Sequence, residues 1–229
     1  MIEGTIAVLN LGCVDVGLTR WLAAQPSTVE IDLIETAPDA PRGEIARKRN
    51  VAIDRMRGDF ILYVDADCIP PAHALDTFCS RALPLLGGVC LERSSTFDVC
   101  ATRTFEPTIR YQLDELPATG LLPVLALGAG CLFIHRQAFE KLTPPWFRCG
   151  QLVVDCLTED ADFCLRAMEA GITPYLDCSV RVGHRVGGVC WPSDSGVRMQ
   201  WEESAHRELL VRSFPTPTPE PAVVTAGAL

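Results

Sequence analysis

The stretch FILYVDADCIPP, residues 60–71, joins a strongly apolar run to two carboxylates. Residues 60–64 are almost entirely apolar, as expected of a strand that is buried on both faces of a sheet. Asp65 and Asp67 follow this run at once, and no cation stands beside them in the sequence. A buried strand that ends on two negative charges predicts a positively charged partner at that edge of the sheet.

The residues before this stretch alternate between strand and helix patterns. They predict strands and helices in the order strand, helix, strand, helix, strand, over residues 5–9, 18–24, 29–34, 44–56 and 60–64. This alternation indicates an α/β fold, Rossmann-like in its connections, with a mostly parallel central sheet flanked by helices.

Shorter elements follow along the chain. The pattern predicts helices over 73–86, 137–142 and 158–170, and strands over 87–92, 124–127, 131–135, 173–175 and 180–182. The stretch 197–214 is amphipathic, and its apolar residues are interpreted as docking contacts: Met199, Leu209, Leu210 and Phe214. Residues 94–117 give no clear pattern and are interpreted as a mobile insertion. The last residues hold four prolines and almost no charge, so we expect one domain over 1–213 and a disordered tail over 214–229.

Composition narrows the class of protein. The formal net charge of −9 disfavours nucleic acid and anionic lipid as default partners. The longest uncharged stretch, 118–134, contains Pro123 and three glycines, so no membrane span is expected, and the N-terminus does not resemble a signal peptide. None of the 11 cysteines forms a C-x-x-C pair. We interpret them as reduced, mostly buried thiols of a cytoplasmic protein.

Asp65 and Asp67 have the spacing of neighbours on one side of an extended chain. In a parallel α/β sheet, ligands bind beyond the carboxyl ends of the strands, where this pair is predicted to lie. Such a pair favours a hard divalent cation, Mn²⁺ or Mg²⁺, which would also hold a diphosphate. The alternative is a solvated turn, because Asp is common in turns.

Glu159, Asp160 and Asp162 fall in the first turn of the helix predicted over 158–170. Carboxylates are favoured there by the helix dipole alone, which is one sufficient explanation. The functional interpretation is that one of them faces the cleft as a general base, mounted on the rigid end of a helix.

His184 follows a short predicted strand and precedes a glycine-rich turn. It is either a structural histidine or the third protein ligand that the aspartate pair lacks, and an imidazole suits Mn²⁺ better than Mg²⁺. In the second interpretation, Arg185 beside it meets a phosphate.

The helix that begins RGEIARKRN, residues 42–50, is strongly basic. It is either a solvated helical face or a cationic wall for a diphosphate. In the second interpretation, Asn50 forms a hydrogen bond with a nucleotide.

Together these motifs resemble the nucleotide-sugar-dependent glycosyltransferases of the GT-A fold, and glycosyltransferase family 2 most of all. Residues 42–71 resemble that family's stretch from an Arg-Asn pair to its Asp-x-Asp motif. GAGCLFIHRQAFEKL, residues 128–142, resembles its acceptor-side strand and the following helix. Residues 158–184 resemble its Glu-Asp helix, a short strand and a metal-binding His. The match covers residues 40 to 190, and the order and spacing of the motifs make it specific.

The resemblance implies a role for each matching residue. Asp65, Asp67 and His184 would hold the metal and the diphosphate, and Asp160 would deprotonate the acceptor hydroxyl in an inverting, hexosyltransferase-like displacement. Glu159 would contact sugar or acceptor. The implied nucleotide-sugar contacts are Glu35, Arg49, Asn50, Asp65, Ala66 and Arg185. The implied acceptor or sugar contacts are Gly128, Gly130 and Trp146.

The sequence departs from the family pattern at the first two strands. The first strand ends in VLNLG rather than in a Pro-x-Tyr/Phe-Asn turn. The second ends in LIETAPDAPRG rather than in Asp-Asp-x-Ser, which leaves Glu35 as the substitute for the residue that reads uracil. These departures leave the nucleotide base open, with a UDP-sugar as the leaning.

Three alternatives stay open at this point. A retaining GT-A transferase shares the Asp-x-Asp motif, and a non-catalytic scaffold could bind a nucleotide sugar without turnover. A sugar-1-phosphate nucleotidyltransferase needs a basic glycine-rich N-terminal loop, and residues 9–17 lack the basic residue. The acceptor is open as well: a glycan, lipid-linked sugar, protein, small molecule or modified nucleic acid. Trp146 is either a platform for a sugar or a buried loop anchor.

Overall fold

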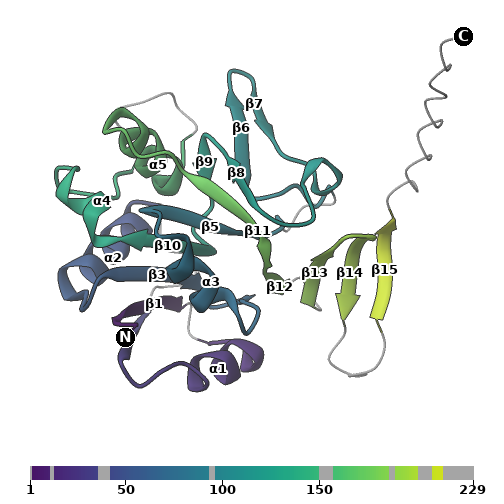
Figure 1. Cartoon of the computed structure of the whole chain (residues 1–229), viewed down its shortest axis with the longest axis horizontal. Coiled ribbons are helices and arrows are strands. Elements are labelled where there is room, and N and C mark those ends of the chain that lie inside the picture. The colour runs from purple at the N-terminus through teal and green to yellow at the C-terminus, as the bar shows by residue number, and fades with distance from the viewer. Residues whose placement is uncertain are drawn as a thin grey trace, which may run out of the picture.

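The strand that carries residues 60–64 lies inside a seven-stranded sheet of order β2-β1-β3-β10-β5-β11-β8 (Figure 1). The computed structural model describes residues 2–10, 13–35, 42–92, 96–149, 157–185, 189–200 and 208–213. The strands of this sheet are β1 (Gly4–Asn10), β2 (Val29–Glu35), β3 (Phe60–Asp65), β5 (Leu85–Val89), β8 (Leu121–Pro123), β10 (Cys131–His135) and β11 (Tyr175–Arg181).

Helices cover both faces of this sheet. They are α1 (Val16–Ala23), α2 (Arg42–Arg55), α3 (Ala74–Arg81), α4 (Arg136–Glu140) and α5 (Glu159–Glu169), with a 3₁₀ turn at Leu113–Glu115. The described part of the chain thus confirms the predicted strand–helix alternation up to β3. The helix expected over 73–86 ends earlier, because Pro84 disfavours helical backbone in the residue before it and lacks an N–H.

Alternating side chains of the central strands pack into two separate cores. On β3, Ile61 and Tyr63 join the core under α2, α4 and α5, whereas Leu62 and Val64 join the core under α1 and α3. All four are fully buried. The apolar run of the sequence therefore belongs to a strand covered on both faces, as its composition predicts.

The expectation of a mostly parallel sheet was wrong, because the sheet is mixed. β1 is parallel to β2 and to β3, and β5 is parallel to β11. β10 is antiparallel to both β3 and β5, and β8 is antiparallel to β11. The reason lies in the connection: residues 128–130 bring the chain to the carboxyl end of β3, so β10 starts there and runs back along it.

A second, antiparallel sheet of order β15-β14-β13-β12-β4 starts beside the carboxyl end of β3. Its strands are β4 (Cys68–Ile69), β12 (Gly183–Arg185), β13 (Val189–Ser193), β14 (Gly196–Gln200) and β15 (Glu208–Ser213). The described residues of the amphipathic stretch 197–214 belong to the strands β14 and β15. Ser193 pairs with Gly196 across a two-residue turn, and Gly196 has a φ of 129°, outside the helical range. Phe214 and the predicted tail lie outside the described residues.

A third sheet of order β7-β6-β9 covers part of the segment expected to be a mobile insertion. Its strands are β6 (Ala101–Phe105), β7 (Thr108–Arg110) and β9 (Ala126–Leu127). The stretch 94–117, which shows no clear pattern in the sequence, thus contains β6, β7 and the 3₁₀ turn, and residues 94 and 95 lie outside the described part.

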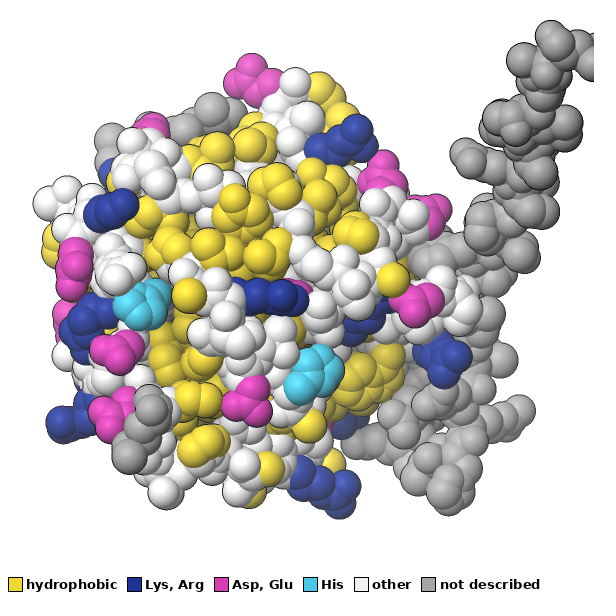
Figure 2. Space-filling view, viewed as in Figure 1, with side chains coloured by type: hydrophobic (Ala, Val, Ile, Leu, Met, Phe, Trp, Pro, Cys, Tyr) yellow, Lys and Arg dark blue, Asp and Glu magenta, His cyan; other side chains and the backbone are white. Residues whose placement is uncertain are grey.

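Charges of both signs are interspersed over the face seen in Figure 2, and apolar side chains gather near its centre. The net charge of −9 is therefore not spread as one acidic field over this face. No helix among the described residues is long and apolar enough to cross a membrane.

Candidate functional site

Asp65 is the last residue of β3 and lies opposite Leu9 of β1. Its place in the strand alternation puts its side chain on the face of Tyr63, which α2 covers. Arg49 of α2 reaches it there, with Nη2 3.4 Å from the Asp65 Oδ1. The carboxylate that the sequence leaves without a local cation therefore has one from a neighbouring helix.

Arg49 is itself buried and joins two acidic groups. Its Nε lies 3.3 Å from Oε1 of Glu159, while its guanidinium lies over the rings of Tyr63, at 5.2 Å, and Phe147, at 5.9 Å. Burial lowers the pKa of Arg49, but the charges of Asp65 and its other acidic neighbours outweigh it and raise the pKa overall. Arg49 therefore stays cationic inside the fold.

Glu159 and Asp160, adjacent at the start of α5, have different surroundings. Glu159 is buried against Arg49, and burial raises its pKa, with Arg49 opposing the rise and Asp160 adding to it. Asp160 is partly exposed and accepts hydrogen bonds from the backbone N–H groups of Ala129 at 3.1 Å and Ala161 at 2.8 Å, and from the Thr158 hydroxyl. These donors fix the orientation of the Asp160 carboxylate.

Residues 128–130 link Asp65 to Asp160. The Gly130 carbonyl accepts the backbone N–H of Asp65 at 3.2 Å, and the next residue back, Ala129, donates to Asp160. A Cβ on Gly128 would lie 2.9 Å from the Cβ of Cys100, so the glycine permits this close passage. Gly130 and Ala129 thus form the backbone bridge between the two carboxylates, while Gly128, the other glycine predicted to contact acceptor or sugar, donates its N–H to the Cys100 carbonyl at 2.7 Å.

Asp67 lies beyond the end of β3, in a turn, so the alternation of the strand does not extend to it. Its Oδ1 lies 3.6 Å from Nε2 of His184. The other ring nitrogen, Nδ1, lies 2.6 Å from the carbonyl oxygen of Leu91, which can only accept, so Nδ1 carries the hydrogen. In the neutral imidazole, this leaves the lone pair on Nε2, the atom that faces Asp67.

Arg185 makes its observed contacts within the protein. Its guanidinium forms an ion pair with Asp15, the N-cap of α1, and its backbone N–H donates to the Asp67 carbonyl at 3.0 Å. Ala66 accepts the backbone N–H of Asp15 at 2.9 Å. Glu35 is exposed at the end of β2, and the residues that follow it lie outside the described part.

Asn50 and Trp146 make their observed contacts within the protein. The Asn50 side chain donates to the carbonyls of Ala46 and Phe147, each at 2.8 Å, and accepts the N–H of Phe147 at 3.0 Å. The Trp146 ring packs edge-on against Phe139 at 5.8 Å. Both side chains anchor the loop that follows α4, which is the structural alternative left open for Trp146.

No protein-family model and no curated protein matches this sequence. Solved structures do match the fold. A197 from STIV superposes with a TM-score of 0.58 at 16% identity, covering 86% of this chain and 93% of that one. GalNAc-T7, in a crystal structure with UDP, GalNAc and Mn²⁺, superposes with a TM-score of 0.55 at 11% identity, covering 79% of this chain and 43% of that one.

The chain has the GT-A glycosyltransferase fold. The resemblance stated from the motifs is confirmed at this level, with the mixed sheet in place of the mostly parallel one. In this GT-A fold, the carboxyl end of β3 carries Asp65, with Asp67 just beyond it.

One cluster of side chains near these residues was not predicted from the sequence. Cys68, directly after Asp67, and Cys90, one residue past the end of β5, lie with His184 in a cluster. A short-range spacing such as C-x-x-C does not connect these three residues, because they come from three separate strands or strand ends. The sequence predicted that the cysteines are mostly buried thiols, but not that two of them lie beside His184.

Proposed function

We propose that the protein transfers a sugar from a nucleotide-diphosphate sugar to an acceptor hydroxyl, with inversion at the anomeric carbon. The observation that carries this proposal is the grouping of three aspartates in a GT-A fold. Asp65 and Asp67 lie at the end of β3, and residues 128–130 connect Asp65 to Asp160. Sugar transfer to a hydroxyl needs a base on the acceptor side and countercharge on the leaving diphosphate, and this grouping offers candidates for both.

The side chains of Asp67 and His184 lie at a distance that suits two ligands of one divalent cation, and we assign Asp65 to the same site from its place two residues before Asp67 at the end of β3. The 3.6 Å between the Asp67 Oδ1 and the His184 Nε2 is too long for a hydrogen bond. It is near the separation of about 3.0–3.6 Å expected for two ligand atoms, each about 2.1 Å from one ion. The bond from Nδ1 to the Leu91 carbonyl orients the ring, as outer partners of metal-binding histidines do. When bound, the ion would neutralise charge on the departing diphosphate.

The remaining chemistry falls to the protein's own side chains. Asp160, held by backbone donors at the start of α5, takes the proton from the acceptor oxygen as that oxygen attacks the anomeric carbon and the bond to the diphosphate breaks. Glu159 is buried against Arg49, so in this proposal it positions Arg49 rather than touching the acceptor. Nη1 of Arg49, buried and without a hydrogen-bond partner among the described residues, is the atom we assign to the donor.

The donor is proposed to be a UDP-sugar and the ion Mn²⁺. The presence of UDP and Mn²⁺ in the GalNAc-T7 structure supports this choice, as does an imidazole among the ligands. We further propose that residues 1–213 form one domain and that the protein is cytoplasmic.

Thermal unfolding of the full chain tests the donor site. UDP, GDP, CDP, ADP and dTDP are added in turn with Mn²⁺, Mg²⁺ or EDTA. We expect UDP with Mn²⁺ to raise the melting temperature and EDTA to abolish the rise, because a ligand that binds only the native state stabilises it by mass action. Release of UDP from a UDP-sugar panel, with and without candidate acceptors, then separates a transferase from a scaffold that only binds.

Asp67→Ala should weaken nucleotide binding in the presence of Mn²⁺ by about 100-fold, at the upper end of what changes around a metal site cost. Asp114→Ala, at an exposed carboxylate of the 3₁₀ turn, is the matched control and should bind like the wild type. Nucleotide binding that survives both EDTA and Asp67→Ala would contradict the proposed metal–diphosphate site.

A further inference from the structure

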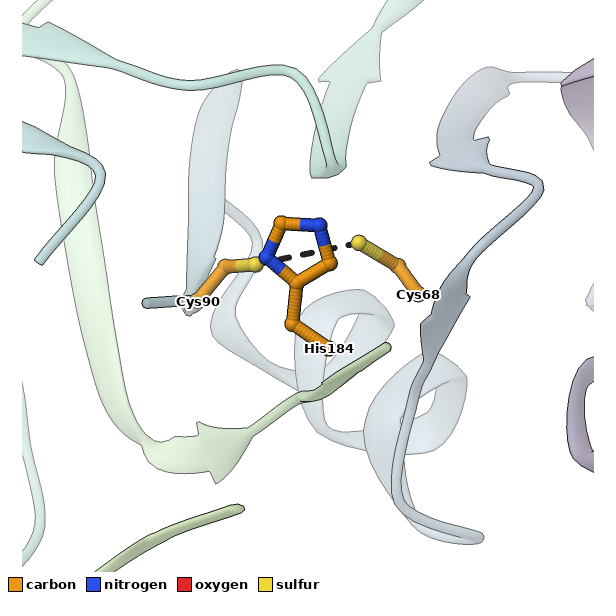
Figure 3. Close-up of side chains that lie close together, drawn as sticks. All are labelled: Cys68, Cys90 and His184. Atoms are coloured by element: carbon orange, nitrogen blue, oxygen red, sulfur yellow. Dashed lines mark hydrogen bonds between the residues drawn. The ribbon is translucent and has the colours of Figure 1, made fainter. Parts of the chain in front are cut away.

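Two buried thiols and an imidazole converge just behind the Asp-x-Asp turn (Figure 3). The ligand atoms of Cys68, Cys90 and His184 all lie within 4.8 Å of one another. Cys68 and Cys90 are almost fully buried, and in the view of Figure 3 the imidazole ring of His184 overlaps the dashed line that joins their sulfur atoms. Sulfur and imidazole nitrogen are the ligands that zinc prefers, in contrast to the oxygen ligands of Asp65 and Asp67.

The distance between the two sulfur atoms fits a shared metal ion. The Cys68 Sγ lies 3.7 Å from the Cys90 Sγ. Two thiolates bound to one tetrahedral zinc ion, each about 2.3 Å from it, are about 3.8 Å apart. The sulfurs of a disulfide would be only about 2.0 Å apart. The observed spacing therefore matches a metal-bound pair without any movement of the sulfurs.

Separate elements hold the three ligands in place. Cys68 and His184 are cross-strand partners of β4 and β12, so their side chains project from the same side of that sheet. The backbone of Cys90 is fixed by a bond from the Cys100 N–H to its carbonyl at 2.8 Å. A Cβ on Gly130 would lie 3.1 Å from the Cys68 Sγ and 3.6 Å from the Cys90 Sγ, so the glycine leaves the sulfurs uncrowded.

We propose that Cys68, Cys90 and His184 form a second metal site, selective for zinc, beside the oxygen ligands of the Asp-x-Asp turn. Binding releases the proton of each thiol to solvent and leaves two thiolates, whose combined negative charge balances the positive charge of one Zn²⁺. The buried cluster thereby becomes electrically neutral, which removes most of the cost of placing charge in the interior. Nδ1 of His184 keeps its bond to the Leu91 carbonyl, and Nε2 is the ligand atom.

Without a metal, these thiols hold their protons. A hydrogen bond with Cys90 lowers the pKa of Cys68, but burial and the charge of Asp65 raise it by more. A hydrogen bond with Cys100 lowers the pKa of Cys90, and the bond with Cys68 together with burial raises it well above its ordinary value.

One consequence rests on the proposed function. His184 has a single Nε2, so zinc in the thiol site competes with the donor metal for it. Zinc should therefore reduce the thermal shift caused by UDP and Mn²⁺ in the wild type, and should reduce it less in Cys90→Ala. The thiol site itself does not depend on the donor proposal, because its ligands can be tested with no nucleotide present.

Cobalt(II) is the probe that tells sulfur ligands from oxygen ligands, since cobalt bound to thiolate absorbs in the near ultraviolet through sulfur-to-metal charge transfer. The full chain is stripped with chelator, reduced and titrated with Co²⁺, and then with Zn²⁺. We expect the band to saturate at one equivalent and zinc to displace it. Cys68→Ala and Cys90→Ala should lose the band and bind zinc about 100-fold or more weakly.

Matched controls separate this site from the other thiols. Cys13 and Cys149 are exposed, and the Cys13→Ala, Cys149→Ala double variant should keep the band, as should Cys178→Ala at a buried thiol of β11. Absence of the band in the wild type would overturn the proposal, even if the Cys68 and Cys90 variants failed to fold. Its persistence in the folded Cys68→Ala, Cys90→Ala double variant would also overturn it. Loss of the UDP shift with an intact cobalt band would instead refute the donor site alone.

Discussion

The two faces of the sheet differ at the carboxyl end of β3, although only a few residues separate them. On the face under α2 and α5, Asp65 and Glu159 are ionisable groups held by the buried cation Arg49. On the opposite face, Cys68 and Cys90 are buried thiols packed in the second core. The first face therefore contains charged groups in ion pairs. The second contains neutral thiols, which become thiolates only when a metal ion binds.

The strand pattern explains this separation. Residues of β3 alternate between the two cores, so Asp65 follows Tyr63 to the helix α2 side. The turn at residues 66–67 then brings Cys68 to the other core. The oxygen ligand Asp65 and the sulfur ligand Cys68 are thus three residues apart in sequence but lie on opposite faces of the sheet. The His184 side chain lies near both Asp67 and the two thiols.

Removing the proposed base is the largest expected effect on the oxygen face. Asp160→Asn keeps the size of the side chain and, with its single carbonyl oxygen, one of the two contacts with the Ala129 and Ala161 N–H groups, but removes the proton acceptor. We expect kcat for sugar transfer to fall about 10²–10⁴-fold, the usual contribution of a general base, while UDP binding is unchanged. Asp114→Asn is the control at an exposed carboxylate. Transfer by Asp160→Asn at the wild-type rate would assign the base elsewhere.

Removing the buried cation should cost the most stability. Arg49→Met leaves Glu159 buried without its partner, and breaking a buried pair in this way costs about 3–5 kcal/mol. The matched control lies two residues away on the same helix: the Arg47 side chain is 59% exposed in its pair with Glu44, against 5% for Arg49. Urea unfolding should show a large loss for Arg49→Met and no change for Arg47→Met. Equal midpoints would mean that the buried network adds no stability.

The sulfur face should respond much less in the absence of a metal. Cys90→Ala removes one sulfur atom from a neutral, buried group, so we expect a loss of about 1 kcal/mol in the chelator-treated protein. The difference from the wild type should then widen when zinc is added, because only the wild type gains the binding free energy. Identical effects with and without zinc would place the metal elsewhere.

The smallest expected effect is a dependence on pH. Burial raises the pKa of Glu159 above its ordinary value of 4.5, so the folded state holds this proton more tightly than the unfolded state. Its contribution to stability is fully present below the unfolded pKa and is lost as pH rises through the higher folded value. The unfolding free energy of the wild type, minus that of Glu159→Gln, should therefore fall over this pH range. A difference that rises with pH would mean that the attraction to Arg49 outweighs burial.

The early part of the fold could be predicted because local patterns determine it. Residues 5–64 alternate between strands and helices with apolar faces, and the end of β3 at Asp65 follows from the abrupt change from apolar to charged residues. The direction of β10 could not be predicted, because it depends on where residues 128–130 enter the sheet. The amphipathic pattern over 197–214 did not predict the strands β14 and β15, since such a pattern alone does not reveal a cross-strand partner.

The sequence predicted which residues form the candidate site better than it predicted the contacts between them. The sequence placed Asp65 and Asp67 at a sheet edge, and His184 does lie beside Asp67. It did not predict that Arg49 is buried between Asp65 and Glu159, because a basic helix looks the same whether it faces solvent or core. Nor could spacing reveal the thiol cluster, whose members meet only through tertiary packing.

The strand β4 has a consequence for synthesis of the chain. Its two residues follow Asp67 directly, yet their partner in the second sheet is β12, near the other end of the described chain. A ribosome therefore produces Asp65 and Asp67 long before His184, at about 5–20 residues per second. During that interval β4 lacks its partner strand, so neither the Asp67–His184 pair nor the thiol cluster can assemble until translation has passed β12.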